Sequence, residues 1–160
     1  MFTGPEIAAA FTQLGATHVV WLPDSTLGTW EEALEAAPRL QLVRVCREGE
    51  AWAIAAGLQI GGARPIVVMQ TTGLFESGDS LRNALYDLQL PLTAWIGHRS
   101  YLLPESKDSA KRFAEPVLKA WAIDYFLLER AEQLPAALEH LEACAAASRS
   151  GVVLMAEGKG

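Results

Sequence analysis

Short apolar runs alternate with helical stretches along the chain, and this alternation constrains the fold more than any other feature. Six runs have the length and the β-branched or aromatic content of strands, namely HVVWLP (18–23), LQLVRVC (40–46), PIVVMQ (65–70), PLTAWIG (91–97), IDYFLL (123–128) and GVVLMAE (151–157). Helices are expected near 4–14, 28–37, 49–60, 77–88, 111–121 and 131–147. Strands joined by helices form parallel sheets covered on both faces. We therefore expect one domain over 1–160, a three-layer α/β/α fold with a parallel six-stranded sheet.

Composition and charge exclude several classes of protein. Hydrophobic residues make up 51% of the chain and charged residues 20%, which is typical of globular proteins. No apolar run approaches the ~20 residues of a membrane span, and the N-terminal residues lack the basic cluster of a secretory signal. Two cysteines are too few for a disulfide framework, so we expect a cytoplasmic protein. A net charge of −6 argues against nucleic acid as a partner but is compatible with small anionic ligands.

Polar residues gather where four of the predicted strands end. In parallel sheets covered by helices, ligands bind beyond the carboxyl ends of the strands, near the point where the strand order reverses. The four strand-end segments are Pro23-Asp24-Ser25, Arg47-Glu48, Gln70-Thr71-Thr72-Gly73 and Gly97-His98-Arg99. We expect the ligand site to be built from these segments.

The segment 97–112 is more basic than the rest of this acidic chain. It contains Arg99, Lys107, Lys111 and Arg112 against Glu105 and Asp108. Two interpretations stand side by side, a basic pocket for an anion and a solvated loop of mixed charge.

The common sequence motifs for gripping a diphosphate or a metal are missing. The chain has no GxxxxGK[ST], GxSxG or HExxH, and GLQIGG falls at a predicted helix end rather than at a strand-to-helix turn. Two cysteines and three histidines are spread along the chain, so no metal site is expected in it.

An acid at the start of an apolar helix needs an explanation of its own. Glu48 opens the segment REGEAWAIAAG, in which Ala, Trp and Ile follow. One interpretation is an ordinary helix-start acid that favours the positive end of the helix dipole. The other is a working carboxylate in apolar surroundings, where it can exchange a proton within a fixed hydrogen bond.

Four segments resemble the pyrimidine-binding domain of thiamine diphosphate enzymes, in the branch of the phosphonopyruvate and sulfopyruvate decarboxylases. REGEAWAIAAG is similar to the glutamate-bearing segment, and VVWLPDSTL resembles the first strand and turn. PIVVMQTTGL and LPLTAWIGHRS resemble the next two strand ends, in the same order. The resemblance implies a carboxy-lyase in which Glu48 bonds N1′ of the cofactor's aminopyrimidine ring and favours its imino tautomer.

Other roles follow from the same resemblance. The residues implied to line the pyrimidine ring are Thr72, Gly73 and Leu74. Those implied to face the substrate are Asp24, Ser25, Gln70, His98 and Arg99. Five of these have a plainer interpretation: Asp24 or Ser25 as a helix cap, Gly73 as a tight turn, Gln70 as a partner of backbone groups, and Arg99 as a surface residue.

The chain also departs from the family. Full-length relatives hold Mg²⁺ and the diphosphate with Gly-Asp-Gly and a later Asn; SGDS is the nearest string here, and no matching segment follows it. The resemblance therefore implies an alpha subunit whose beta-subunit partner carries the diphosphate and Mg²⁺ domain, in an alpha–beta hetero-oligomer acting on an anionic 2-oxo acid such as sulfopyruvate or phosphonopyruvate. The alternatives are a subunit of another thiamine-dependent lyase or carboligase, and a non-catalytic α/β binding module.

Overall fold

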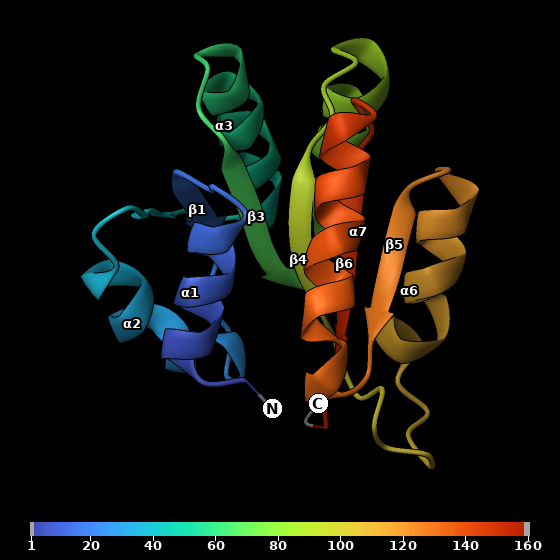
Figure 1. Ribbon diagram of the computed structural model, residues 1–160. Helices are drawn as coiled ribbons and strands as arrows, with labels where there is room; N and C mark the ends of the chain where they lie inside the picture. Colours follow the sequence, from blue (N-terminus) through green and yellow to red (C-terminus); the bar gives the residue numbers. More distant parts are fainter. Residues whose placement is uncertain (1, 159–160) are drawn as a thin grey trace.

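The computed structural model describes residues 2–158, in which six parallel strands form one sheet (Figure 1). The strand order is β2-β1-β3-β4-β6-β5. The strands are β1 (His18–Trp21), β2 (Gln41–Arg44), β3 (Pro65–Gln70), β4 (Thr93–His98), β5 (Asp124–Leu128) and β6 (Gly151–Ala156). All five strand pairs are parallel, which confirms the predicted fold class.

Helices cover both faces of the sheet and complete the three layers. On one face lie α1 (Gly4–Gln13), η1 (Leu27–Trp30), α2 (Glu31–Ala36) and α7 (Leu134–Ala146), which follows the short η3 (Ala131–Gln133). On the other lie α3 (Glu48–Ile60), α4 (Thr71–Glu76), α5 (Gly78–Arg82), the π-helical turn η2 (Asn83–Asp87) and α6 (Ser109–Ala120). In Figure 1 the first group stands in front of the sheet. Within residues 2–158, none of the helices has the length and apolar content needed to cross a bilayer.

The region after β3 differs from the prediction of one helix over 77–88. Helix α4 starts at Thr71, directly after the strand, and two further short segments follow it. The backbone oxygen of Gly73 accepts from both the backbone N–H and the hydroxyl of Ser77, a side-chain bond of the kind that bends helices. Ser77 lies at the junction where α4 ends and α5 begins.

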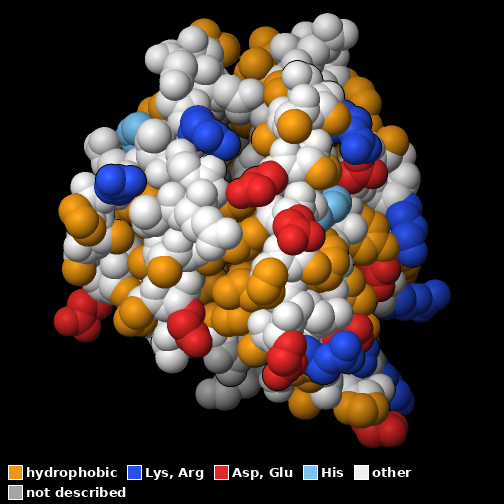
Figure 2. Space-filling view, viewed as in Figure 1, with side chains coloured by type: hydrophobic (Ala, Val, Ile, Leu, Met, Phe, Trp, Pro, Cys, Tyr) orange, Lys and Arg blue, Asp and Glu red, His pale blue; other side chains and the backbone are white. Residues whose placement is uncertain are grey.

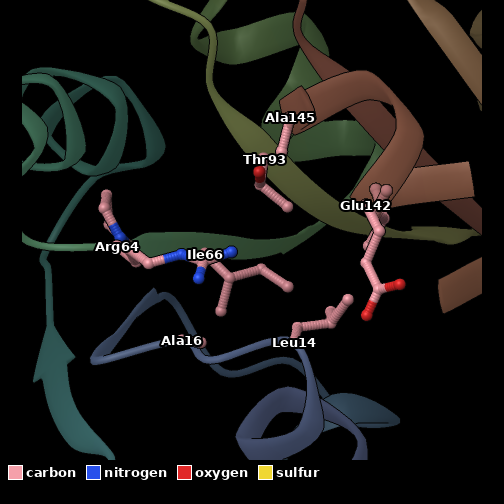
Figure 3. Close-up of a pocket in the computed structure, with 9 residues that line it drawn as sticks. Leu14, Ala16, Arg64, Ile66, Thr93, Glu142 and Ala145 are labelled. Atoms are coloured by element: carbon pink, nitrogen blue, oxygen red, sulfur yellow. The ribbon is translucent and has the colours of Figure 1, made fainter. Parts of the chain in front are cut away.

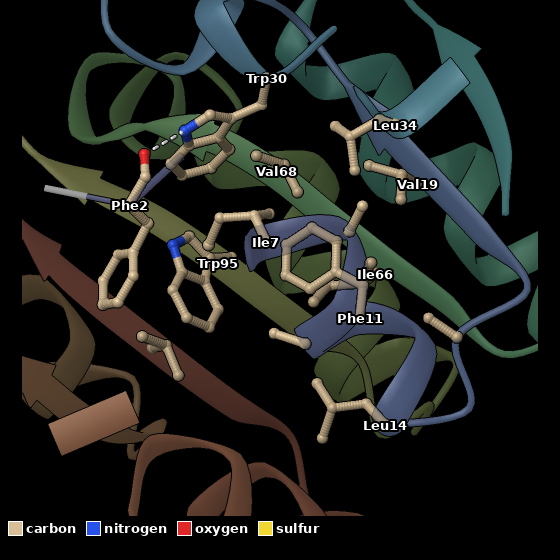
Figure 4. Close-up of a cluster of buried hydrophobic side chains, with 14 of the residues drawn as sticks. Phe2, Ile7, Phe11, Leu14, Val19, Trp30, Leu34, Ile66, Val68 and Trp95 are labelled. Carbon is tan, nitrogen blue, oxygen red and sulfur yellow. Dashed lines mark hydrogen bonds between the residues drawn. The ribbon is translucent and has the colours of Figure 1, made fainter. Parts of the chain in front are cut away.

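Buried aromatic rings fix the helices of the front face to the sheet. Trp95 of β4 makes edge contacts with Phe2 and Phe11, and the indole N–H of Trp30 donates to the backbone oxygen of Phe2 at 3.0 Å (Figure 4). Strands β3 and β6 are buried on both faces, as expected of a parallel sheet covered by two helical layers. This packing gives the loops at the strand ends a rigid base.

The strand order places the reversal of direction between β1 and β3. From β1 the chain moves to β2 on one side, then returns to β3 and β4 on the other. The strand arrows of Figure 1 point downward, so the carboxyl ends form the lower edge of the sheet in that view. This is the edge at which ligands of such sheets bind.

Candidate active site

Four acidic or amide side chains lie at this carboxyl edge, each from a different strand end. Asp24 follows β1, Glu48 follows β2 and begins α3, Gln70 ends β3, and Glu157 follows β6. The first three belong to segments that the sequence predicts to form the site. Glu157 does not.

Glu48 is half-buried and lies against α4. A Cβ atom on Gly73 would lie 2.9 Å from Oε1 of Glu48 and closer still to its Cγ, so only glycine fits beneath this carboxylate. Within residues 2–158 no hydrogen bond engages the Glu48 carboxylate. Its carboxylate is therefore held in place by packing, with its oxygen atoms available to a ligand. The alternative of a tight turn for Gly73 is wrong, because this residue lies inside α4.

The start of α3 is fixed from the neighbouring helix. The carboxylate of Glu76 accepts from the backbone N–H of Gly49 at 3.1 Å and from the guanidinium of Arg47 at 2.7 Å. One turn further along α3, the buried indole N–H of Trp52 donates to the hydroxyl of Ser77 at 2.7 Å. These bonds join α3 to α4 and α5, and they set the position of Glu48 relative to Gly73.

Thr72 and Leu74 flank Gly73 on α4 in different surroundings. Leu74 is buried in the core of the α3 face, whereas Thr72 is exposed and its hydroxyl donates to Oε1 of Gln70 at 3.3 Å. The three residues predicted to line the pyrimidine ring thus include one core residue and two that reach the edge beside Glu48.

Gln70 and Glu157 meet across β4. Both side chains lie on the α1 face of the sheet, from strands on either side of β4. The amide nitrogen of Gln70 donates to Oε2 of Glu157 at 3.2 Å. Between them stands Gly97, where a Cβ would lie 2.7 Å from Cδ of Glu157 and closer still to its Oε1. Burial, followed by the negative charge of Asp24, raises the pKa of Glu157 to about 7.

Ser25 lines a groove that also contains Glu157, and Asp24 precedes Ser25 in the loop after β1. One oxygen of Asp24 accepts the backbone N–H groups of Thr26 and Leu27, both at 2.7 Å, so this residue stabilises the start of η1. Its other oxygen is buried and has no partner among residues 2–158. The rest of the groove is lined by Phe2, Thr26, Thr29, Trp30, Leu102, Met155 and Gly158.

His98 and Arg99 point away from one another. His98 is buried on the same face as Ile96, toward α6, and burial lowers the pKa of its imidazole. The structure therefore does not bring His98 together with Gln70 and Asp24. Arg99 uses its Nε atom to bond Asp108 at 2.9 Å. The backbone N–H of Ala110 is the main reason why the pKa of Asp108 is lowered.

The basic residues of 97–112 do not converge on a pocket. Besides the pair of Arg99 with Asp108, Lys111 donates to the backbone oxygen of Leu103, and the Arg112 guanidinium lies 5.0 Å from the Phe113 ring centre. These contacts favour the interpretation as a solvated loop of mixed charge. On the face in Figure 2, acidic and basic side chains are likewise interspersed.

A small pocket at the opposite edge of the sheet makes a poor ligand site. It lies at the amino ends of β3 and β4, and its lining includes Leu14, Ile66, Thr93 and the charged residues Arg64 and Glu142 (Figure 3). Its volume of about 40 Å³ holds little more than water. Cofactor sites are several times larger.

The side chains at the carboxyl edge fit the pyrimidine half of thiamine diphosphate. A half-buried carboxylate with uncommitted oxygen atoms suits a ring nitrogen that carries or shares a proton. By contrast, residues 2–158 contain no group of three or more His, Cys, Asp or Glu residues that could hold a metal ion. The described residues therefore fit the pyrimidine part of the cofactor and lack a metal site for its diphosphate.

Comparison with known proteins gives relatives of one kind. The chain is 31% identical over 111 residues to phosphonopyruvate decarboxylase of Streptomyces viridochromogenes, an alignment that covers 68% of this chain and 27% of the relative. It is 33% identical over 94 residues to the sulfopyruvate decarboxylase subunit alpha of Methanothermobacter thermautotrophicus, covering 58% of this chain and 56% of that subunit. The matched regions are thus about a quarter and about half of these relatives. No protein-family model matches the chain.

The fold has a solved counterpart as well. An X-ray structure from Mycobacterium smegmatis, assigned as a thiamin diphosphate-dependent enzyme, superposes on 98% of this chain and 31% of its own with a TM-score of 0.72 and 24% identity. The homologues of this chain are therefore phosphonopyruvate and sulfopyruvate decarboxylases, and its fold is the α/β fold of thiamine diphosphate-dependent enzymes.

Proposed function

We propose that residues 1–160 form the pyrimidine-binding domain of a thiamine diphosphate-dependent 2-oxo acid decarboxylase, with Glu48 as its catalytic acid–base residue. The observation that carries this proposal is the carboxylate of Glu48 lying against Gly73 at the carboxyl edge of the sheet, in a chain whose homologues are decarboxylases. When bound, thiamine diphosphate supplies the stabilisation of the negative charge left by the departing carbon dioxide. Glu48 would hold a proton at N1′ of the aminopyrimidine ring.

The remaining residues of the edge would position the two ligands. Gly73 leaves room for the carboxylate, and Thr72 and Leu74 would flank the pyrimidine ring. On the substrate side we place Gln70, together with Asp24, Ser25 and Arg99. His98 belongs to the same strand-end segment as Arg99 but is buried on the opposite face of the sheet from Gln70. Arg99 bonds Asp108 through Nε alone, so its two Nη atoms would serve an oxyanion of the substrate.

We further propose that a partner subunit supplies the diphosphate and Mg²⁺ site, in an alpha–beta hetero-oligomer. The relative that is itself a subunit alpha supports this arrangement. The partner would cover the exposed side of Glu48 and exclude water from it. Two free cysteines suit a reducing cytoplasm as the compartment.

The proposal is tested by reconstitution. We expect the chain alone neither to bind thiamine diphosphate at micromolar concentration nor to decarboxylate sulfopyruvate or phosphonopyruvate, and the mixture with its beta subunit to do both. In the mixture, Glu48→Gln should lower turnover by at least ~100-fold, because it removes the acid–base function, with unfolding temperature nearly unchanged. The control is Glu142→Gln, an exposed acid at the opposite edge. Activity of the isolated chain would refute the split site, and an active Glu48→Gln mixture would refute the role of Glu48.

A second candidate within the same chemistry is a lyase or carboligase for a less charged 2-oxo acid. It is favoured by the bond between Arg99 and Asp108, because the Asp108 carboxylate partly neutralises the guanidinium that would otherwise bind the sulfonate or phosphonate of the substrate. Arg99→Ala separates the two. If the substrate carries a sulfonate or phosphonate, KM for it should rise more than KM for pyruvate. Equal changes would favour the second candidate.

A further inference from the structure

A second carboxyl group at the site, Glu157, is not used by the proposed function. Its side chain is fully buried, with 0% exposure. Its backbone N–H donates to the oxygen of His98 and its backbone oxygen accepts from Leu102, so the residue is fixed on both sides. These bonds fix the backbone of Glu157 at the end of β6.

The contact between Glu157 and Gln70 depends on a gap in β4. The two residues are 87 positions apart and lie on β3 and at the end of β6, with β4 between them. They meet because Gly97 has no side chain there. A residue with a side chain at this position would separate the pair.

The surroundings of Glu157 offer its carboxyl group little compensation for burial. Oε2 accepts one hydrogen bond, from Gln70, and Oε1 has no partner within the described part of the chain. A buried carboxylate with few partners is costly, and protonation relieves that cost. The raised pKa of Glu157, about 7, agrees with this geometry.

The charged groups around Glu157 act in opposite directions. From the loop after β1, Asp24 raises the pKa of Glu157, while Arg99 from the end of β4 lowers it, as does the amide of Gln70 on β3. His98, the remaining titratable residue at the end of β4, faces α6 on the other side of the sheet.

We propose that Glu157 is a positioning residue that sets which end of the Gln70 amide faces the substrate, so that binding of an anionic 2-oxo acid takes up a proton at Glu157. As a carboxylate, Glu157 accepts from the Gln70 NH₂ group, and the amide oxygen is then turned toward Thr72. As an acid, it donates its proton to the amide oxygen, and the NH₂ group is turned outward. An outward NH₂ group donates to a substrate carboxylate, whereas an outward oxygen repels it.

The inference rests on the proposed function only where it assigns Gln70 to the substrate. Its first test needs neither cofactor nor substrate. In the isotopically labelled full chain, NMR should show the Glu157 side-chain carbon titrating with a midpoint near pH 7 and the side-chain amide of Gln70 shifting with the same midpoint. Asp24→Asn, which retains an oxygen for the backbone bonds, should lower the midpoint. In Glu157→Gln the Gln70 signal should stay constant between pH 5 and 9.

Two results would overturn the coupling of these residues. One is titration of Glu157 below pH 5, as for an exposed acid, and the other is a Gln70 signal that does not follow Glu157. Should Glu157→Gln fail to fold, Gln70→Glu provides a second readout, the titration midpoint of Glu157, because a second acid beside Glu157 should raise the midpoint further. An unchanged midpoint in this variant would also contradict the contact.

The second test uses the assembled enzyme with sulfopyruvate. Above pH 7, KM of the wild type should rise about tenfold per pH unit, since each binding event takes up one proton. In Glu157→Gln, whose amide can bond Gln70 in either orientation, KM should be nearly independent of pH between 6 and 8. Equal pH profiles would overturn the link to the substrate. An assembly that is inactive at every pH would refute the proposed function, while the NMR titration would still decide the coupling.

Discussion

Replacing Gly97 by alanine tests the packing on which the buried end of the site depends. The new Cβ would lie 2.7 Å from Cδ of Glu157 and closer still to Oε1, well inside contact distance. Glu157 resists displacement, because its side chain is fully buried and its backbone is bonded to His98 and Leu102. The substitution must therefore displace the acid or separate β4 from β6.

The expected cost has two parts. Overpacking a core costs about 1–3 kcal/mol. Loss of the hydrogen bond from Gln70 to Glu157 adds about 1–2 kcal/mol. Because the parts overlap, we expect Gly97→Ala to lower the free energy of unfolding by about 2–4 kcal/mol. For a domain of this size, that lowers Tm by about 4–16 °C.

The assay is urea unfolding of the full chain with two comparison variants. Gly57→Ala is the matched control, since a Cβ at this glycine of α3 meets no atom within 4 Å. It should stabilise the protein by about 0.5–1 kcal/mol, as expected for alanine in a helix. The second comparison is Gly97→Ala in a Glu157→Ala background, where the space for a methyl group is open and the further loss should be below about 0.5 kcal/mol.

Two results would refute this reasoning. Gly97→Ala could be as stable as the wild type, which would mean that Glu157 is free to move. Alternatively, the same loss could occur with and without the Glu157 side chain, and the clash would then lie elsewhere.

Three further predictions concern the same edge. Gly73→Ala should lower turnover of the assembled enzyme by about tenfold or more, because the new Cβ displaces the Glu48 carboxylate. Tm should change by only a few degrees, since Glu48 is half-exposed. Unchanged turnover would contradict the contact between Gly73 and Glu48. Trp52→Phe should cost about 1–2 kcal/mol in urea unfolding, through the lost bond to Ser77; no loss would show that water replaces it. The fold raises the pKa of Glu157 from the ordinary 4.5 to about 7, so the contribution of Glu157 to the free energy of unfolding should be largest below pH 5 and fall as pH rises to 7. The difference in unfolding free energy between the wild type and Glu157→Gln, measured across this range, should show this decline, and a constant difference would contradict it.

Much of the fold could be predicted because each element carries its own local signal. The run PIVVMQ at 65–70 coincides with β3, and helix α3 begins one residue before the predicted start. The segment 71–88 could not be predicted as well. There the side-chain bond from Ser77 to Gly73 and the approach of Glu48 act on α4, and neither is visible in periodicity.

The residues of the candidate site likewise differ in how well the sequence predicts them. Glu48 can be found from the sequence because an acid stands out before an apolar helix. Glu157 carries a similar signal, as the acid that ends the apolar run GVVLMAE, but its meaning depends on Gln70 and Gly97, which reach it only through the strand order. For His98 the sequence gives the strand end but not the face, and the structure turns the ring toward α6.

The central claim is that Glu48 holds a proton at N1′ of thiamine diphosphate, and proton exchange measures this most directly. The measurement is the rate at which the proton at C2 of the cofactor's thiazolium ring exchanges with D₂O, followed by quenched NMR in the assembly with the beta subunit. The account predicts fast exchange in the wild type, exchange at least ~100-fold slower in Glu48→Gln, and no effect of Glu142→Gln. Equal rates in the wild type and Glu48→Gln would contradict it.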